Sequence, residues 1–412
     1  MTIVEFYDHT PIDNMISCLA NEPEKIIFIG ERKVLAAQEE HFYRFLDEMD
    51  NFTTVLEFKS VNRTSLASIV ACLTAIVQDN EAVCFDLTGG DDLCLVAAGI
   101  VYERFPEKNI QLHRYNVTSG KVYDCDGDGV VASDAPPSIT VEQNVILHGG
   151  AVVTAEQKPH GTIYWDLTLD FMRDVGELWK LCKSNVNQWN FQLSVLSQAS
   201  KIALPCEDPL FLCCSWRELR QHYEHRGFYI DLKALFPELA RLGFIRDMRL
   251  ENDYFSLYFR DEQIRRCLTK AGTLLELKTY VCAMQVEENG DYLFNDGLTG
   301  VLLDWDGVVF EGGTTDTCNE VDVILMHGLV PVFISCKNGS VDSTELYKLN
   351  TVAERFGGKY AKRVLVCSGR AVSAQADDPL ADRAKLMGIT IIDSVQDMSD
   401  EEFSRHLKNI VH

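Results

Sequence analysis

The chain contains 412 residues, of which 46% are hydrophobic and 24% are charged, so it is long enough for two or three globular domains. Its 38 basic residues against 62 acidic ones give a net charge of −24, which argues against a protein that coats nucleic acid without regard to sequence. A nuclease is not excluded, because an active site that collects carboxylates for a divalent cation is itself acidic.

Targeting and redox signals are the next features to consider. The stretch MTIVEFYDHT has neither the basic nor the apolar region of a secretory signal, and no segment offers the roughly 18 consecutive apolar residues of a membrane span. We therefore expect a soluble, cytoplasmic protein with no membrane partner. The 14 cysteines form no C-x-x-C pair, which argues against a zinc ribbon and indicates reduced, buried thiols.

The N-terminal part alternates between two kinds of pattern. Short apolar stretches at 25–30, 53–61, 81–87 and 109–117 are separated by stretches with helical periodicity. Near-continuous apolar strands that alternate with helices predict a parallel sheet covered on both faces. We expect a Rossmann-like domain at residues 1–158, which ends in β-hairpin structure from about residue 118 onward.

The middle segment, 159–265, is predominantly helical at first. A helix that ends at Gly243, followed by two short strands across a polar turn, has the outline of a winged helix. Such a unit serves either as a spacer or as a reader of DNA. The helix ALFPELARLG carries only one Arg and one Glu, which argues against the second role.

The C-terminal part, 266–412, predicts a helix, three strands, and then helix, strand, helix and strand. The second and third strands, NEVDVILM and PVFISCK, are separated by a short turn at 327–331, so we expect them to pair antiparallel. This turn brings Asp322, near the start of one strand, beside Lys337, at the end of the next.

A carboxylate and an ammonium group at the ends of two buried strands suit metal-dependent hydrolysis of a phosphodiester. Carboxylates hold Mg²⁺ or Mn²⁺ at the scissile phosphate, and a lysine orients the attacking water or stabilises the developing negative charge. The plainer alternative is a surface ion pair between Asp322 and Lys337 with no chemistry.

At these positions, residues 266–395 resemble the PD-(D/E)xK nuclease superfamily. Its pattern is an acidic residue on the first helix, an Asp on the second strand and (D/E)-x-K on the third. The corresponding residues are Glu276, Asp322 and Ser335-Cys336-Lys337. The resemblance implies that Mn²⁺ or Mg²⁺ is held by Asp322, Glu276 and the backbone carbonyl of Cys336.

Ser335 departs from the superfamily pattern, because serine is a poor metal ligand. Two other carboxylates could replace the missing one. Glu320 lies on the same strand face as Asp322 by period-two alternation, and Glu345 opens the following helix, from which it could reach the site. Candidate phosphate contacts form a basic stretch further along: Lys359, Lys362, Arg363 and Arg370.

The N-terminal part contains a second candidate site. Thr88, Gly89 and Gly90 form the turn from a buried strand into a helix, where the backbone can approach a ligand closely and the helix N-terminus attracts phosphate. However, there is no G-x-G-x-x-G fingerprint, and the acidic pair at 91–92 would repel a pyrophosphate. A nicotinamide-dependent dehydrogenase is therefore disfavoured.

This turn and the whole pattern of 1–120 resemble the CRISPR-associated Rossmann-fold sensor domain, called CARF. Such domains dimerise, and their paired strand ends enclose a cyclic oligoadenylate. For each candidate contact, the alternative is a turn residue that fixes a strand–helix corner. The ligand contacts implied by the resemblance are Thr10, Asn62, Thr88, Gly89, Gly90 and Asp91.

Taken together, the three parts resemble the CARF nucleases of type III CRISPR antiviral defence. The resemblance implies a homodimer, allosteric activation by cyclic tetra-adenylate, and metal-dependent cleavage of DNA, RNA or both with little sequence specificity. The alternative is a cyclic-oligoadenylate-sensing, DNA-binding regulator with an inactive nuclease fold. Because the strand-end loops offer hydroxyls and amides, we do not expect the sensor to degrade its ligand.

Overall fold

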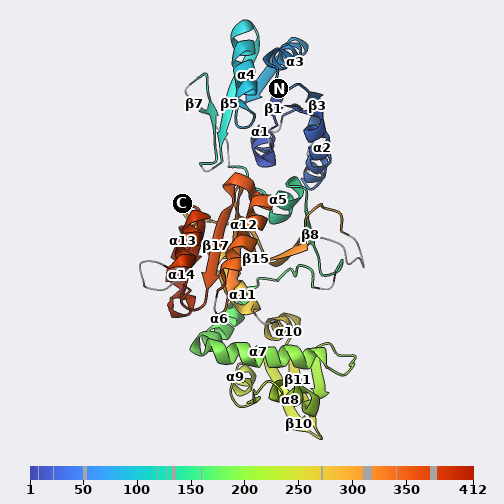
Figure 1. Cartoon of the computed structure of the whole chain (residues 1–412), viewed down its shortest axis with the longest axis vertical. Helices are drawn as coiled ribbons and strands as arrows, with labels where there is room; N and C mark the ends of the chain where they lie inside the picture. Colours follow the sequence, from blue (N-terminus) through green and yellow to red (C-terminus); the bar gives the residue numbers. More distant parts are fainter. Residues whose placement is uncertain are drawn as a thin grey trace.

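The computed structural model describes residues 1–412 except 8, 22, 50–52, 118, 128, 132–135, 159, 271, 310–317, 340 and 372–377. The molecule is elongated, with its three larger sheets following one another along the long axis (Figure 1). Within the described ranges, no helix is both long enough and apolar enough to span a membrane.

The N-terminal sheet has seven strands in the order β3-β2-β1-β4-β5-β6-β7. The first five are parallel and the last two add a hairpin, so the predicted parallel sheet is confirmed. The strand order reverses between β1 and β4, where open α/β sheets bind ligands at their carboxyl ends. The strands are β1 (Thr2–Phe6), β2 (Lys25–Gly30), β3 (Val55–Ser60), β4 (Ala82–Asp86), β5 (Asn109–Asn116), β6 (Lys121–Asp124) and β7 (Gly129–Val131).

Helices cover both faces of this sheet. Val4 and Phe6 of β1 belong to the same core as α3 and α4, whereas Phe28 of β2 packs in another core with α2. The alternation of side chains along each strand therefore supplies both layers of the core. The helices are η1 (Pro11–Asn14), α1 (Ile16–Asn21), α2 (Arg32–Asp47), α3 (Leu66–Asp79) and α4 (Asp92–Arg104).

A six-stranded mixed sheet forms the centre of the molecule, in the order β18-β17-β16-β15-β14-β8. Its strands are β8 (Ala151–Val153), β14 (Asp296–Asp304), β15 (Cys318–His327), β16 (Val330–Lys337), β17 (Lys362–Cys367) and β18 (Ile389–Ile392), and a separate two-stranded ribbon consists of β12 (Glu287–Glu288) and β13 (Asp291–Tyr292). Its helices are α11 (Thr273–Met284), α12 (Ser343–Gly357), η2 (Gly358–Tyr360), α13 (Pro379–Leu386), η3 (Val395–Asp397) and α14 (Asp400–Lys408).

The segment after β7 differs from the expected hairpin structure. Residues 141–147 form helix α5 (Val141–Leu147), and β8 joins the central sheet by pairing antiparallel with β14. The hairpin prediction is therefore right for β6 and β7 and wrong for α5 and β8. The cause is tertiary, because Val141 and Val145 of α5 pack in one core with strands β14 and β15 of the central sheet.

The middle segment folds into helices around a three-stranded antiparallel sheet, in the order β10-β11-β9. The expected helix followed by two strands is present as α9, β10 and β11, and β9 adds a third strand. Asn252 and Asp253 both have positive φ angles at the turn between β10 and β11. The elements are α6 (Leu169–Ser184), α7 (Val186–Lys201), β9 (Phe211–Ser215), α8 (Trp216–Glu224), α9 (Phe236–Arg241), β10 (Ile245–Glu251), β11 (Tyr254–Phe259) and α10 (Glu262–Thr269).

The central sheet is buried between two cores. Along β15, Ile324 and Met326 belong to the core that contains α12 and α5, whereas Val323 and Leu325 belong to the core that contains α11 and the middle segment. Alternate residues of a strand face opposite sides of the sheet, so polar side chains on β15 and β16 can contact α11 on one side and α12 on the other.

Candidate functional site

The pairing of β15 with β16 places the predicted acidic residue beside the predicted lysine. The two strands are antiparallel, with Val323 opposite Ile334. One position further along, the same register places Asp322 opposite Ser335. The Nζ atom of Lys337 lies 3.7 Å from Oδ2 of Asp322. The side chains that the sequence separates by 15 positions are thus neighbours in space.

Asp322 is held by its neighbours on β16. The backbone N–H of Cys336 donates to Oδ2 of Asp322 over 2.6 Å, and the hydroxyl of Ser335 donates to the same oxygen over 3.2 Å. The carboxylate is therefore oriented by two donors and one nearby ammonium. Ser335 acts here as a hydrogen-bond donor to the carboxylate, which differs from the role of the acidic residue it replaces in the superfamily pattern.

The first turn of α12 adds a second carboxylate to the same ammonium. Oε2 of Glu345 lies 3.0 Å from Nζ of Lys337, and its other oxygen lies 3.0 Å from Nζ of Lys348. Burial works against the charged form of Lys337, but Asp322 and Glu345 outweigh it and raise the pKa of the lysine. Lys337 therefore remains an ammonium between two carboxylates.

Glu276 approaches from α11, on the opposite side of the sheet. It is only 8% exposed, and burial followed by repulsion from Asp322 raises the pKa of Glu276 to about 8. Burial also raises the pKa of Asp322, against the opposing effect of Lys337. The positive charges of Lys270 and Lys337 oppose the rise in the pKa of Glu276 but do not cancel it.

Glu320 is at the outer rim and has a partner that the sequence did not reveal. Nζ of Lys270, just after α10, lies 2.6 Å from Oε1 of Glu320, and both side chains are about half exposed. The sequence pattern did not predict Lys270 at the site, because this lysine lies outside the strand motif. It reaches Glu320 because α10, which precedes it, packs close to the site. A small cavity joins Glu320 to Asp322, Lys337 and Glu345.

The chemistry of these groups is compatible with a metal site. Within the part of the chain that the structure describes, no three His, Cys, Asp or Glu side chains converge closely enough to hold a metal ion. Glu345 and Glu320 are instead paired with lysines. Carboxylate oxygens suit Mg²⁺ or Mn²⁺, and the raised pKa values of Asp322 and Glu276 show where a cation would relieve repulsion.

At the N-terminal sheet, the two glycines lie at a close backbone approach to β1. Gly90 has a φ of +94°, and a Cβ atom there would lie 2.5 Å from Cβ of Phe6. A Cβ atom on Gly89 would lie 3.0 Å from the carbonyl oxygen of Phe6 and 3.1 Å from Nδ2 of Asn14. The hydroxyl of Thr88 accepts a hydrogen bond from the backbone N–H of Tyr115 over 2.8 Å. Packing alone therefore accounts for the small residues of this turn.

Asp91 and Asn62 also have local structural roles. Asp91 caps α4 by accepting from the backbone N–H of Cys94 over 3.0 Å, and it lies 2.8 Å from the guanidinium of Arg63. The side-chain oxygen of Asn62 accepts from the backbone N–H and the hydroxyl of Thr64. The Arg63–Asp91 pair ties together the turns that follow β3 and β4.

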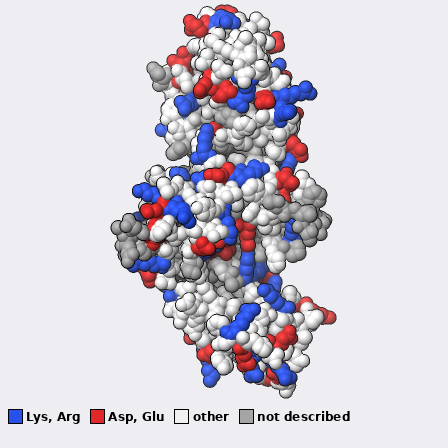
Figure 2. Space-filling view, in the orientation of Figure 1, with Lys and Arg blue, Asp and Glu red and all other residues white. Residues whose placement is uncertain are grey.

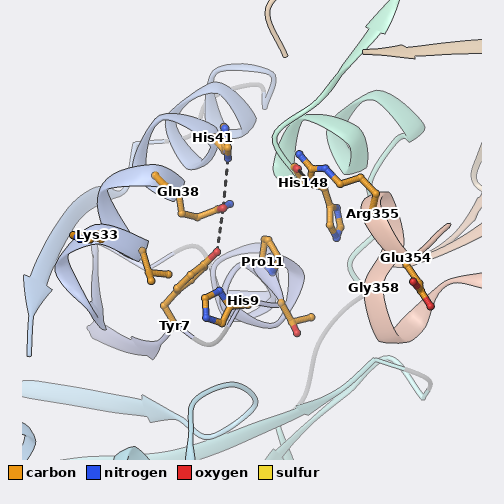
Figure 3. A pocket seen from close by; sticks show the side chains of 13 residues that line it. Tyr7, His9, Pro11, Lys33, Gln38, His41, His148, Glu354, Arg355 and Gly358 are labelled. Carbon is orange, nitrogen blue, oxygen red and sulfur yellow. Dashed lines mark hydrogen bonds between the residues drawn. The ribbon is translucent and has the colours of Figure 1, made fainter. Parts of the chain in front are cut away.

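Thr10, one of the predicted ligand contacts, lines a cavity. The cavity lies between the turn after β1, helix α2, the end of α5 and the end of α12 (Figure 3). His9, His41 and His148 line it as well. The expectation that the strand-end loops offer only hydroxyls and amides is therefore wrong, because His9 lies in the loop after β1 itself. Helix α2 and the residue after α5 add two more imidazoles.

One ion pair that the sequence did not predict connects the N-terminal and central sheets. Asp13 of η1 is fully buried, and its carboxylate lies 2.5 Å from Nζ of Lys359 and 2.8 Å from the hydroxyl of Tyr360. Lys359 was a candidate phosphate contact and has this partner instead. Figure 2 shows acidic and basic side chains interspersed over the visible face, without a continuous basic surface.

Comparison with known proteins identifies the fold. No model of a known family and no curated protein matches the sequence. Among solved structures, protein VC1899 from Vibrio cholerae is 17% identical with a TM-score of 0.71, covering 99% of this chain and 97% of its own. Can2 from Sulfobacillus thermosulfidooxidans, solved in complex with cyclic tetra-adenylate, is 14% identical with a TM-score of 0.65, covering 100% and 97%. This chain therefore has the same overall fold as both proteins along almost its whole length.

Proposed function

We propose that this protein is a metal-dependent endonuclease that is switched on by cyclic tetra-adenylate and acts in type III CRISPR antiviral defence. The observation that carries the proposal is the juxtaposition of Asp322, Lys337 and Glu345 at the ends of two central strands. Support for the activator comes from the shared fold with Can2, which was solved with that ligand. The proposed substrate is DNA, RNA or both, cut with little sequence specificity.

The residues that would hold Mg²⁺ or Mn²⁺ are Asp322, Glu276 and the backbone carbonyl of Cys336. When bound, such a cation supplies positive charge at the phosphate and lowers the pKa of a coordinated water. Lys337 is positioned to stabilise negative charge that develops on the phosphate. Ser335 and the backbone N–H of Cys336 orient Asp322.

The proposed sensor is the N-terminal sheet, in a homodimer whose paired strand ends enclose the ring. Its proposed contacts follow β1, β3 and β4: Thr10, Asn62, Thr88, Gly89, Gly90 and Asp91. A chain of contacts links the two sites. Thr10 is the N-cap of η1, and Asp13 within η1 contacts Lys359. Lys359 follows the end of α12, the helix whose first turn carries Glu345. Ligand binding would therefore act on the helix that pairs with Lys337.

The second candidate function is a ligand-sensing regulator with an inactive nuclease fold. It is favoured by Ser335 in place of an acidic residue and by the pairing of Glu345 and Glu320 with lysines. This alternative predicts tight DNA binding without any metal-dependent product.

A cleavage assay separates the two functions. Purified protein is mixed with supercoiled plasmid, single-stranded DNA and single-stranded RNA, with or without Mn²⁺ and cyclic tetra-adenylate. We expect products when both are present, and Lys337→Ala should reduce cutting at least about a hundredfold while ligand binding is retained. Lys408→Ala is the matched control, because that lysine is similarly exposed and lies 2.9 Å from Glu288. Normal cutting by Lys337→Ala would show that the site is wrong.

A further inference from the structure

Two neighbouring aromatic side chains are exposed in the loop between α8 and α9, which we call the aromatic loop (residues 225–235). Tyr229 is 81% exposed and Phe228 is 54% exposed. Within the described residues, no other aromatic side chain is as exposed as Tyr229. Adjacent exposed rings form an apolar patch, and such a patch on a well-supported segment indicates a surface for a partner.

The aromatic loop is fixed to helix α7. Phe228 packs against Phe191 of α7, with the two ring centroids 5.7 Å apart. The side-chain amide of Gln192, the next residue of α7, donates to the backbone carbonyl of Asp231 over 3.1 Å. Because the loop is held at both of these points, Tyr229 is presented to solvent from a supported backbone.

Helix α7 also contacts the end of the strand that carries Lys337. Nδ2 of Asn190 donates to the backbone carbonyl of Asn338 over 2.9 Å, and Nδ2 of Asn338 donates to Oδ1 of Asn190 over 2.6 Å. Asn338 directly follows Lys337 in the chain. In Figure 1, α7 lies between the central part of the molecule and helices α8 and α9. Two consecutive residues of α7, Asn190 and Phe191, therefore contact the end of the proposed nuclease site and the aromatic loop.

Basic residues flank the two exposed rings. Arg226 and Lys233 are exposed, and neither has a carboxylate within ion-pair distance in the described part of the chain. The one acid of the loop, Asp231, accepts from the backbone N–H of Lys233 over 2.9 Å. Flat rings between two free cations are typical of surfaces that bind single-stranded nucleic acid, where bases stack on the rings and phosphates lie beside the cations.

We propose that the aromatic loop binds an unpaired segment of the nucleic-acid substrate, with Tyr229 stacked on a base and Arg226 beside a phosphate. The assignment rests on the proposed function, because it gives the nuclease a surface that holds a strand near Lys337. A base inside a duplex has both faces covered by its neighbours, so this surface selects unpaired nucleotides. Stacking does not read sequence, because every base has a flat face.

The test measures binding separately from cutting. Full-length Lys337→Ala protein, alone and combined with Tyr229→Ala, is titrated with fluorescently labelled oligodeoxythymidylate and oligouridylate, with and without cyclic tetra-adenylate. Anisotropy gives the dissociation constants, and we expect Tyr229→Ala to weaken binding about tenfold by removing one stacked base. The two labelled strands show whether DNA, RNA or both occupy the surface. Equal affinities of the two proteins for both strands, or no binding by the parent protein under either condition, would overturn the proposal.

An abasic oligonucleotide of the same length separates stacking from charge. It has the phosphates without the bases, so Tyr229→Ala should bind it as the parent protein does. Arg226→Ala should weaken the normal and the abasic strands by the same factor, because its partner is a phosphate. A loss of affinity for the abasic strand in Tyr229→Ala as large as for the normal strands would refute stacking.

Two further variants control for damage to the fold. Tyr229→Phe keeps the flat ring and should bind as the parent protein does. Tyr292→Ala is the matched control, because Tyr292 is also an exposed tyrosine, 67% exposed, and lies on β13 of the two-stranded ribbon. It should leave all affinities unchanged, and a loss equal to that of Tyr229→Ala would count against the site.

This surface and the proposed function can fail separately. A protein that binds strands through Tyr229 but yields no metal-dependent product would keep the surface and lose the nuclease activity. Cutting by Tyr229→Ala at the wild-type rate, with unchanged affinity for the strands, would keep the activity and remove the surface. If the rings cover a second copy of the chain, Tyr229→Ala would lower the mass in sedimentation and leave strand affinity unchanged, which would also overturn the proposal.

Discussion

The pair of carboxylates at Glu276 and Asp322 predicts how stability depends on pH. In the folded protein the pKa of Glu276 is raised to about 8, first by burial and then by repulsion from Asp322. The folded state therefore retains a proton that the unfolded chain releases above its ordinary pKa near 4.5. Stability from this group is fully present below about pH 4.5, falls as the pH rises, and levels off above about pH 8.

The size of the effect follows from the shift. A rise of the pKa from 4.5 to about 8 corresponds at most to ~5 kcal/mol between the two ends of this range. Because Glu276 and Asp322 titrate together, the part that belongs to Glu276 is smaller, on the order of 2–4 kcal/mol. Each kcal/mol shifts the melting temperature of a large domain by roughly 2–4 °C.

The perturbation is Glu276→Gln, which keeps the shape of the side chain and cannot ionise. Thermal unfolding is followed from pH 5 to pH 9 in the absence of divalent cations, for the wild type and the variant. The wild type should lose several degrees more than the variant over this range, and added Mn²⁺ should restore part of the loss in the wild type alone. Parallel curves for the two proteins would refute the reasoning, because Glu276 would then have an ordinary pKa.

Two further predictions concern the N-terminal sheet. Lys359→Met leaves the carboxylate of the fully buried Asp13 without its ammonium partner, so chemical denaturation should show a loss of about 1–3 kcal/mol, and the double variant with Asp13→Asn should recover part of it. Gly90→Ala places a methyl group 2.5 Å from Cβ of Phe6 at a φ of +94°, which should lower the melting temperature by several degrees. Gly99→Ala is its control within α4, because an added Cβ meets nothing within 4 Å there, and it should be neutral or slightly stabilising.

The sequence alone determined the parts of the fold whose signals are local. Near-continuous apolar strands such as KIIFIG and AVCFD, separated by helical periodicity, predict the parallel N-terminal sheet, because strands buried on both faces consist mostly of apolar residues. The short turn at 327–331 likewise dictates that β15 and β16 pair antiparallel, and with it the closeness of Asp322 and Lys337. The position of Glu345 at the start of a helix was also readable, since the helix pattern begins there.

The tertiary structure decided whatever depends on contacts between distant segments. Helix α5 and strand β8 belong to the central part of the molecule and not to the N-terminal sheet. Strand β8 pairs with β14, and the apolar residues of α5 pack in the core of the central sheet. Lys270 reaches Glu320 across 50 positions of the chain, and Asp13 reaches Lys359 across 346. Charge pairs of this kind leave no periodic trace in the sequence, because each requires one polar residue at each of two separate places. The raised pKa of Glu276 has the same origin, since burial and repulsion from Asp322 arise only when α11 packs against the strands.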